Sequence, residues 1–167
     1  TNNVIKQLKK SKEAKEAGIT IVPDCGMGPG MNVSMALLAM EGFDQVEEVR
    51  VWDGGLPQDP QPPWNYNLFF NIAGLTNEYD GNAYFLRQGK VTEVPCFEDI
   101  ETLGFDGVGN LEAAVTSGGL STMPWTYENK IKLLENKTLR YSGHWDQMIA
   151  FRHLGLFRED KLKIENK

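Results

Sequence analysis

Residues 138–146 gather three side chains that can bind an anion or carry a proton. Arg140 presents a planar guanidinium that matches a carboxylate, and Tyr141 and His144 can both exchange protons. The simpler interpretation is an arginine paired with a neighbouring acid and a histidine that caps a helix. We favour a functional role for these three side chains, because they lie close together in one predicted strand-to-helix turn.

Residues 116–122 combine two glycines with hydroxyl side chains just before a predicted helix. Gly118 and Gly119 let the backbone approach a ligand closely, and Ser117 lies beside them. Free amides next to hydroxyls suit a carboxylate or a phosphate. An ordinary helix cap explains the hydroxyls equally well, so both interpretations stay open.

Residues 22–31 form a glycine-rich turn between a predicted strand and a predicted helix. The dinucleotide fingerprint G-x-G-x-x-G fails here, because its third glycine position holds Met31 and because Pro29 has no N–H for a phosphate. We interpret the glycines mainly as allowing a sharp turn and close helix packing. The first helical amides point back toward Asp24 and Cys25, where Cys25 could be a thiolate, although a plain loop cysteine is the simpler interpretation.

Composition and charge argue against several classes of protein. The 167 residues carry a net charge of −6, which opposes binding to nucleic acid. No apolar run reaches the roughly 18 residues that cross a bilayer, so we expect no membrane association. Two cysteines are too few for a disulfide framework, and we expect a cytoplasmic protein. His144 and His153 would lie on opposite faces of one helix, so we expect no metal site.

Periodicity predicts an α/β opening followed by a sheet with helices. Residues 4–17 predict a helix, residues 19–22 a buried strand and residues 31–40 a buried helix. Further strands are predicted at 46–52, 67–72, 83–87, 90–94, 111–116 and 139–141, and helices at 73–79, 121–134 and 145–154. Strands and a hairpin followed by helices favour an antiparallel or mixed sheet with helices on one face.

Taken together, these stretches resemble the saccharopine dehydrogenase superfamily, most of all its lysine 6-dehydrogenase branch. The matching residues occur in the order of the family and lie between residue 19 and about residue 157. They are Val22-Pro23-Asp24-Cys25-Gly26 with Pro29-Gly30-Met31, Gly54-Gly55-Leu56-Pro57 with Asn65-Tyr66, and residues 116–122 with Thr138-Leu139-Arg140-Tyr141 and Gly143-His144.

The resemblance implies an α+β fold whose sheet is similar to that of the C-terminal domain of glyceraldehyde-3-phosphate dehydrogenase. Residues 1–30 would be the remnant of a dinucleotide-binding Rossmann domain. Residues 31–157 would be the substrate-binding and oligomerisation domain, and residues 158–167 a polar tail that is cut short.

The resemblance also implies an activity. We expect hydride transfer, through an imine, between NAD or NADP and an amine-bearing carbon of a small amino acid of the lysine or saccharopine type. The cofactor would be held mainly by a nucleotide-binding domain outside this chain, and the subunits would form a homodimer or a larger homo-oligomer. Ser142 and Trp145 depart from the pattern of the lysine branch, which leaves the substrate open.

The residue roles follow from the same resemblance. Arg140 would bind a substrate carboxylate, with Ser117, Gly118 and Gly119 lining the same cleft. Tyr141, His144 and Asp24 would handle protons or contact an ammonium group, and Cys25 and Gly26 would approach the nicotinamide.

A different class of function is also open. The apolar residues Leu68, Phe69 and Phe70 could belong to a non-catalytic oligomerisation or ligand-sensing module derived from such an enzyme.

Overall fold

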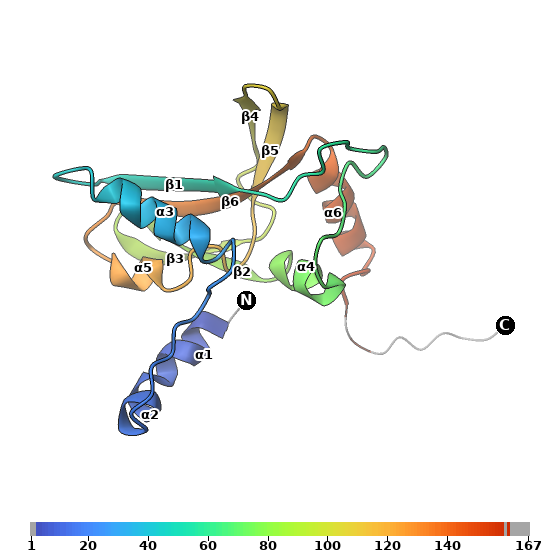
Figure 1. Ribbon diagram of the computed structural model, residues 1–167. Coiled ribbons are helices and arrows are strands. Elements are labelled where there is room, and N and C mark those ends of the chain that lie inside the picture. Colours follow the sequence, from blue (N-terminus) through green and yellow to red (C-terminus); the bar gives the residue numbers. More distant parts are fainter. Residues whose placement is uncertain (1–2, 159, 161–167) are drawn as a thin grey trace.

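The nine-residue strand β6 (Leu133–Tyr141) is the centre of a six-stranded sheet. The computed structural model describes residues 3–158 and 160 (Figure 1). One edge of β6 pairs in parallel with β1 (Glu48–Asp53). The other edge pairs antiparallel, first with β2 (Asn82–Arg87) and then with β5 (Gly109–Val115). The sheet is therefore mixed, as predicted.

Two hairpins extend the sheet away from β6. The predicted hairpin joins β2 to β3 (Lys90–Pro95) through Gln88 and Gly89, whose φ angles of 52° and 78° give the tight two-residue turn. A second hairpin joins β4 (Glu101–Phe105) to β5, and it projects from the sheet in Figure 1. Strand β4 was not predicted, because its charged and glycine-containing sequence lacks the pattern of a buried strand.

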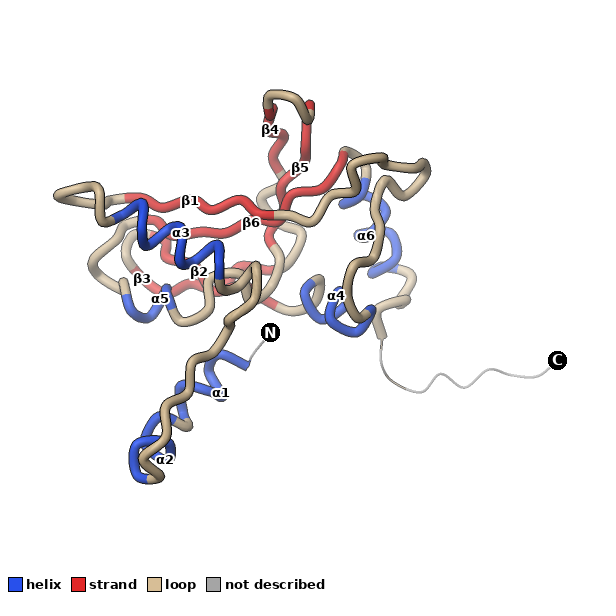
Figure 2. Tube along the Cα trace, in the orientation of Figure 1, coloured by secondary structure: helices blue, strands red, loops and turns tan. Residues whose placement is uncertain are grey.

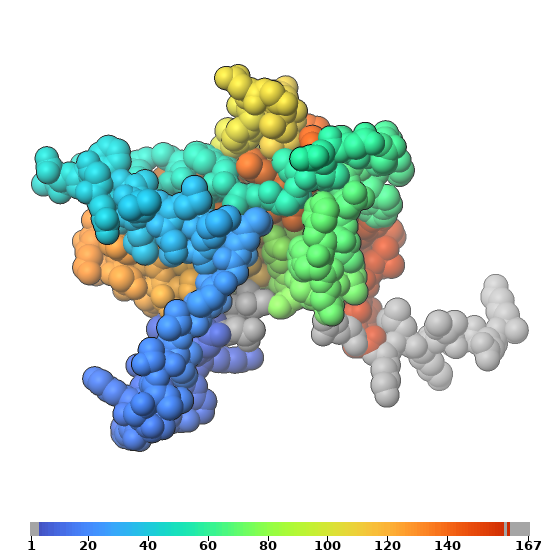
Figure 3. Space-filling model, viewed as in Figure 1, coloured from blue at the N-terminus to red at the C-terminus, as the bar shows by residue number. Residues whose placement is uncertain are grey.

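The helices connect and flank these strands, as the trace in Figure 2 shows. They are α1 (Asn3–Lys9), α2 (Ser11–Glu16), α3 (Met31–Met40), α4 (Ile72–Glu78), α5 (Met123–Thr126) and α6 (His144–His153). The segment that holds α1 and α2 extends away from the sheet in the space-filling view of Figure 3. Helices α3, α5 and α6 each contact a strand of the sheet.

The core explains which face of the sheet these helices cover. Alternate residues of a strand share a face, so Leu134 lies on the same side of β6 as Thr138. Leu134 packs in one cluster with Leu37 of α3 and Met123 of α5. Ala114, which pairs with Thr138, packs in a second cluster with Trp145 of α6. This arrangement confirms an α+β fold with helices on one face.

Several predicted elements differ from the observed ones. Residues 19–22 and 67–72 form no strand, and Ile21 and Phe69 are exposed. A strand needs a partner for its backbone amides, and neither segment pairs with a strand in the described part of the chain. Helix α3 has the predicted bounds but is not buried, because Met35 and Leu38 face solvent.

The helix predicted at 121–134 is mostly absent. It shrinks to the four residues of α5, and Asn129 then turns the chain with a φ of 63°. Strand β6 begins soon afterwards and was predicted only for its last three residues. Its first half was not predicted, because charged residues such as Glu135 and Lys137 are typical of solvent-exposed segments. Both are nevertheless buried in ion pairs.

The predicted domain boundaries stay predictions. Residues 19–30 lead into α3 as loop and turn apart from a single bridge between Gly26 and Gly30. The polar tail at 158–167 lies outside the described residues except for Arg158 and Asp160, which form an ion pair.

The packing of β6 predicts a large stability effect at Leu134, which is fully buried. We expect Leu134→Ala to lower the free energy of unfolding by about 2–5 kcal/mol, because it leaves a cavity between the sheet and α3. Leu38→Ala is the matched control, since Leu38 is 70% exposed, and should change it by less than about 0.5 kcal/mol. Urea unfolding followed by circular dichroism measures both, and equal losses would contradict this description of the core.

Candidate functional site

A cavity of about 750 Å³ opens where two strands end beside the middle of β6. Asp53, the last residue of β1, pairs with Thr138, and Val115, the last residue of β5, pairs with Lys137. The loops that leave β1 and β5 therefore flank Thr138. The lining includes residues 53–56 and 116–119, the end of α4, and Asn136, Thr138 and Arg140 of β6. Alternation along β6 brings these last three side chains to one face.

Arg140 is the basic group of this cavity, and its position is tightly defined. Its Nε donates a hydrogen bond to the hydroxyl of Tyr79 at 2.9 Å, and its Nη1 donates to the carbonyl of Leu139 at 2.9 Å. The ring of Tyr66 lies 4.8 Å from the guanidinium carbon, within cation–π distance. Nη2 is 3.9 Å from Oε1 of Glu78, beyond hydrogen-bonding distance. Nη2 thus keeps donor capacity for a ligand.

Glu78 adds a carboxylate beside Arg140. It ends α4, and the hydroxyl of Thr138 donates to its Oε1 at 3.4 Å. Burial raises the pKa of Glu78, because a low-dielectric environment disfavours the charged form. The positive charge of Arg140 opposes this shift, and the negative charge of Asp53 adds to it.

Asp53 is held by two side-chain amides. Nδ2 of Asn136 donates to its Oδ1 at 2.9 Å, and Nδ2 of Asn32 donates to its Oδ2 at 3.3 Å. Burial raises the pKa of Asp53, while the hydrogen bond from Asn136 and the charge of Arg140 act in the opposite direction. The cavity therefore holds two carboxyl groups that burial partly discourages from ionising.

Both glycine-rich turns approach these groups closely. A Cβ on Gly119 would lie 1.7 Å from Oδ1 of Asn136, and a Cβ on Gly28 would lie 1.9 Å from Oδ2 of Asp53. The side chain of Asn32 also donates to the carbonyl of Gly119 at 3.0 Å, which joins the two turns. The glycines are thus needed for close packing around the site, as the simpler interpretation of the turn at 22–31 held.

Ser117 lines this cavity and also holds the end of α4 in place. Its hydroxyl donates to the carbonyl of Asn77 at 2.9 Å, and its amide donates to the carbonyl of Glu78 at 2.8 Å. Ser117 therefore helps to hold Glu78 at the cavity. Gly118 also lines it and has a φ of 92°, a conformation that favours glycine.

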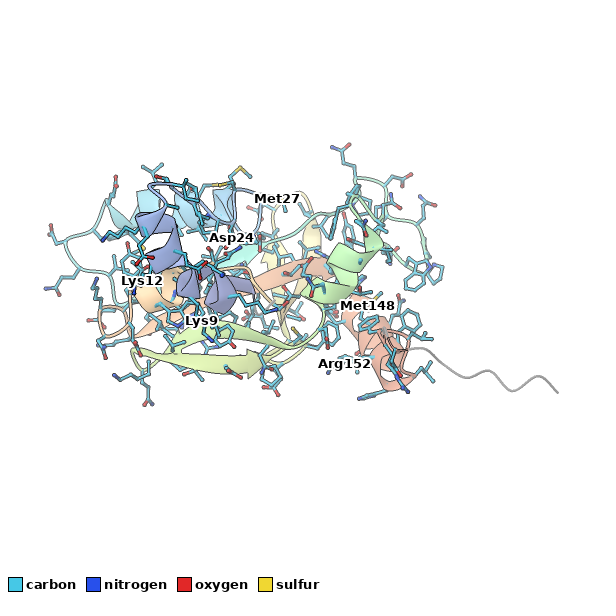
Figure 4. The ribbon with its side chains drawn as sticks, turned by 90° about the horizontal axis from the view of Figure 1, so that it is seen from below. Lys9, Lys12, Asp24, Met27, Met148 and Arg152 are labelled. Atoms are coloured by element: carbon cyan, nitrogen blue, oxygen red, sulfur yellow. The ribbon has the colours of Figure 1, made fainter. Side chains whose placement is uncertain are left out.

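Asp24 also lines the cavity, and Figure 4 labels it with Met27 on the segment that leads into α3. The hydroxyl of Ser121 donates to Oδ2 of Asp24. Ser121 is therefore not the helix cap considered for it, and Thr122, the N-cap residue of α5, makes no side-chain cap. The bond instead ties the turn at 22–31 to the loop after β5.

His144 lies behind the cavity and does not line it. It is buried, and its Nε2 is 2.9 Å from the hydroxyl of Tyr79, the group that receives the hydrogen bond from Arg140. Burial, assisted by the charge of Arg140, lowers the pKa of His144 to about 3. The imidazole is therefore neutral near pH 7. Proton handling by His144 stays a prediction, and the geometry favours a role in positioning Tyr79.

Tyr141 is not in the cavity. It follows Arg140 on β6, so its side chain lies on the opposite face of the sheet. There its hydroxyl donates to the carbonyl of Pro57 at 3.0 Å, and its ring packs with Leu111 and Leu139. Nothing in the described residues supports its predicted role in proton transfer.

Cys25 and Gly26 line a separate cavity of about 570 Å³ beside α3. The thiol of Cys25 is exposed and donates to the carbonyl of Val22 at 3.5 Å. The amide of Gly26 donates to the carbonyl of Pro29 at 3.0 Å, and the amide of Met31 donates to the carbonyl of Gly26 at 2.9 Å.

The amides at the start of α3 also donate hydrogen bonds within this segment. Those of Gly30 and Val33 both donate to Oδ1 of Asn32, at 3.0 and 2.7 Å. These amides are already hydrogen-bonded within the turn and the first residues of the helix. This part of the chain therefore does not fit the phosphates of a dinucleotide.

Sequence reasoning missed several side chains of the cavity. These are Asp53, Tyr66, Glu78, Asn136 and Thr138, with Tyr79 behind Arg140. One signal was available for Asn136 and Thr138, which alternate with Arg140 and share its face if the strand is extended toward Leu133. A second was Asp53 directly before two glycines. Tyr66 stood in the matching stretch Asn65-Tyr66 but was given no role, and Glu78 reaches the site only through the tertiary fold.

Two classes of site are not found in the described residues. No helix within 3–158 is long and apolar enough to cross a membrane. The same part of the chain contains no group of three or more His, Cys, Asp or Glu side chains that could hold a metal ion.

Comparison with known proteins places this geometry in a family. The sequence model described as "Saccharopine dehydrogenase C-terminal domain" matches residues 26–167, most of the chain. The chain belongs to this family. The match includes Arg140, the glycine turn at 116–119 and both cavity carboxylates of β1 and α4.

Relatives of this saccharopine dehydrogenase C-terminal domain are much longer proteins. It is 27% identical over 169 residues to the mitochondrial alpha-aminoadipic semialdehyde synthase of Bos taurus and 26% identical over 176 residues to that of Mus musculus. In both cases 93% of this chain is covered but only 18% of the relative. The domain thus spans under a fifth of their length. Their mitochondrial names give no support to the predicted cytoplasmic location.

A solved structure shows the same fold. The domain superposes on apo histidine-tagged saccharopine dehydrogenase (L-Glu forming) from Saccharomyces cerevisiae with a TM-score of 0.66 and 18% sequence identity. The match covers 87% of this chain and 35% of that one.

The buried histidine of the domain predicts a dependence of stability on pH. An unfolded histidine takes up a proton below about pH 6.5, whereas His144 does so only near pH 3. The contribution of His144 to the free energy of unfolding should therefore fall as the pH drops below about 6.5. His144→Gln removes this titration and keeps an acceptor for Tyr79. Between pH 6 and 4 the free energy of unfolding of this variant should fall less steeply than that of the unmodified domain. The two slopes should differ by up to about 1.4 kcal/mol per pH unit.

Urea unfolding at pH 7, 6, 5 and 4 measures this difference. His153→Gln is the matched control, because His153 is exposed on the same helix, and its curve should follow that of the unmodified domain. Parallel curves for His144→Gln and the unmodified domain would show that His144 is not a buried neutral imidazole.

Proposed function

We propose that this chain is the substrate-binding domain of an NAD(P)-dependent dehydrogenase that acts on the CH–NH group of a lysine- or saccharopine-type amino acid. The family relates it to amino-acid dehydrogenases. The observation that carries the proposal is the convergence of Arg140 and the turn at Gly118-Gly119 on one cavity, with Glu78 and Asp53 beside them.

This arrangement matches the two ends of an amino acid. A guanidinium is the preferred partner of a carboxylate, and Nη2 of Arg140 is not hydrogen-bonded to an acceptor among the described residues. Glu78 and Asp53 can accept hydrogen bonds from an amine. The rings of Tyr66 and Phe69 line the same cavity and add apolar surface beside both interactions.

The chemical step needs a hydride acceptor, which we propose to be NAD or NADP. Bound near the amine-bearing carbon of the substrate, it would accept a hydride from that carbon, and the substrate would become an imine. The turn at residues 22–31 and the start of α3 do not fit its phosphates, so we propose that a separate nucleotide-binding domain of a longer protein holds it. The contribution of this chain is to bind and orient the amino acid.

Assembly and location belong to the same proposal. We propose a cytoplasmic protein whose subunits form a homodimer or a larger homo-oligomer through this domain.

The second candidate is a non-catalytic oligomerisation or ligand-sensing module. It is favoured by the exposed side chains of Leu68, Phe69 and Phe70, which could form an interface. Phe69 and Phe70 also line the cavity, however, which gives them a place in substrate binding. Hydride transfer by the whole protein with a bound amino acid distinguishes the two, because a sensing module binds without turnover.

The binding role of Arg140 can be tested by calorimetry on the whole protein that carries this domain, with L-lysine and saccharopine as ligands. Arg140→Lys keeps the charge but loses the planar fork, and we expect affinity to fall about 10- to 100-fold. Arg50→Lys is the matched control, because Arg50 lies on the other face of the sheet and pairs with Glu135. It should leave affinity unchanged.

Two outcomes would count against the proposed function. One is that neither amino acid binds to the unmodified protein. The other is that Arg140→Lys binds as tightly as the unmodified protein while its thermal unfolding shows that it is folded.

A further inference from the structure

We infer that a second copy of this chain docks on the outer edge of β1, so that two sheets join edge to edge across a two-fold axis. In this arrangement α3 of each copy covers the exposed face of the other α3. The inference rests on the homo-oligomer of the proposed function and names the surface that forms it.

The outer edge of β1 is open. Within residues 3–158, β1 pairs with β6 and with no other strand. The amide of Leu133 donates to the carbonyl of Glu47 at 3.2 Å, so this carbonyl faces β6. Because backbone groups alternate in direction along a strand, those of Glu48, Arg50 and Trp52 face outward, where they can pair with another strand.

The two other edge strands carry features that discourage pairing. Strand β3 begins at Lys90 and ends at Pro95, and β4 contains Gly104. Lysine and proline keep the edges of natural sheets from pairing, and glycine weakens a strand. The sequence of β1, Glu-Val-Arg-Val-Trp-Asp, has none of these residues and is rich in types that favour strands. Of these edges, that of β1 is best suited to receive a strand.

An apolar groove of about 920 Å³ follows the same edge. All six residues of β1 line it, although they alternate between the two faces of the sheet, which places the groove at the edge of the strand. Its other wall is α3, which lies alongside β1 in Figure 1.

The wall formed by α3 carries an apolar stripe. Its members recur every fourth residue along the helix and the residues that flank it, and they are Met27, Met31, Met35, Ala39 and Phe43. The three methionines and the phenylalanine are each more than half exposed. Large apolar side chains gathered in this way beside an open strand edge are typical of a protein–protein interface.

The charges of β1 favour a second copy of the same chain as the occupant. Glu48 and Arg50 lie on one face of the strand, with their charged ends 2.7 Å apart, and both side chains are partly exposed. In an antiparallel pairing centred on Val49, Glu48 of each copy lies opposite Arg50 of the other. A pairing centred on Arg50 would instead place two guanidinium groups opposite each other. The edge is thus complementary to itself in the register centred on Val49.

The same symmetry covers the stripe on α3. A two-fold axis perpendicular to the sheet keeps α3 of both copies on one side of the joined sheet. Val49 and Val51 face that side, where they pack in one cluster with Leu37 of α3. The stripes of the two helices therefore meet above the paired strands, and methionine side chains adapt readily to such a contact.

Met35→Glu tests the contact between the helices. The substitution buries a charge twice in each symmetric pair, and we expect the dissociation constant for self-association of the whole protein to rise about 100-fold or more. Met35 is 63% exposed, so the fold itself should tolerate the change. Leu154→Glu is the matched control, because Leu154 is 73% exposed at the end of α6, and it should leave self-association unchanged. Analytical ultracentrifugation measures both.

Val49→Cys tests the pairing of the strands. Val49 of the two copies would lie opposite each other in a pair that is not hydrogen-bonded, with Cα atoms about 4.5 Å apart, which a disulfide can bridge. We combine it with Cys25→Ser, because Cys25 is exposed. Mild oxidation of the whole protein should give a covalent dimer on a non-reducing gel. Val108→Cys in the same background is the matched control, because Val108 is exposed between β4 and β5, and it should stay monomeric on the gel.

The outcomes separate this inference from the function on which it rests. Self-association of Met35→Glu that is as tight as that of the unmodified protein would overturn the inference. So would a yield of covalent dimer from Val49→Cys no greater than that from Val108→Cys. In both cases the oligomer forms through another surface. If the unmodified whole protein sediments as a monomer, the proposed oligomer fails together with the inference, whereas amino-acid binding by Arg140 is decided by the calorimetry described above.

Discussion

The site depends on the buried guanidinium of Arg140, whose orientation is fixed by contacts on the side away from the cavity. Arg140 is almost fully enclosed, and burial of a charge is unfavourable unless hydrogen bonds and opposite charges compensate for it. Tyr79 and Leu139 take two of its donors, and the rings of Tyr66, Tyr79 and Trp145 surround its carbon at 4.8 to 5.8 Å. With these contacts in place, the remaining nitrogen, Nη2, lies beside Glu78 and the cavity. His144 adds a further layer by holding the hydroxyl of Tyr79.

Close backbone approach is the second constraint. The loop after β5 crosses β6 at Asn136, and the turn before α3 rests on Asp53, so neither Gly119 nor Gly28 has space for a side chain. Asn32 reaches both Asp53 and the carbonyl of Gly119. The glycines that resembled a nucleotide-binding fingerprint are thus explained by packing between two turns. The same packing brings Asp24 to the edge of the cavity.

Part of this site could be predicted from the sequence. Arg140 and the turn at Gly118-Gly119 lie at the end of predicted strands, and both line the same cavity. Tyr141 was expected to handle protons together with its neighbours, because three nearby polar residues were read as one group. A strand sends consecutive side chains to opposite faces, so Tyr141 lies away from Arg140.

Other features depend on contacts between distant residues, which one sequence does not reveal. Glu78 ends a short helix that Ser117, 39 residues later, fastens to the loop after β5. The charged residues Glu135 and Lys137 belong to a buried strand because Arg87 and Glu101 meet them there. Residues 19–22 have the composition of a buried strand but remain exposed, since a strand forms only where a partner supplies hydrogen bonds.

The most direct test of the account is a crystal structure of the whole protein with L-lysine bound. We expect the α-carboxylate to lie about 2.7–3.2 Å from Nη2 of Arg140, with the side-chain ammonium directed toward Glu78 and Asp53. An amino acid bound elsewhere, for example in the cavity beside Cys25, with Arg140 still engaged only by Tyr79 and Leu139, would contradict it.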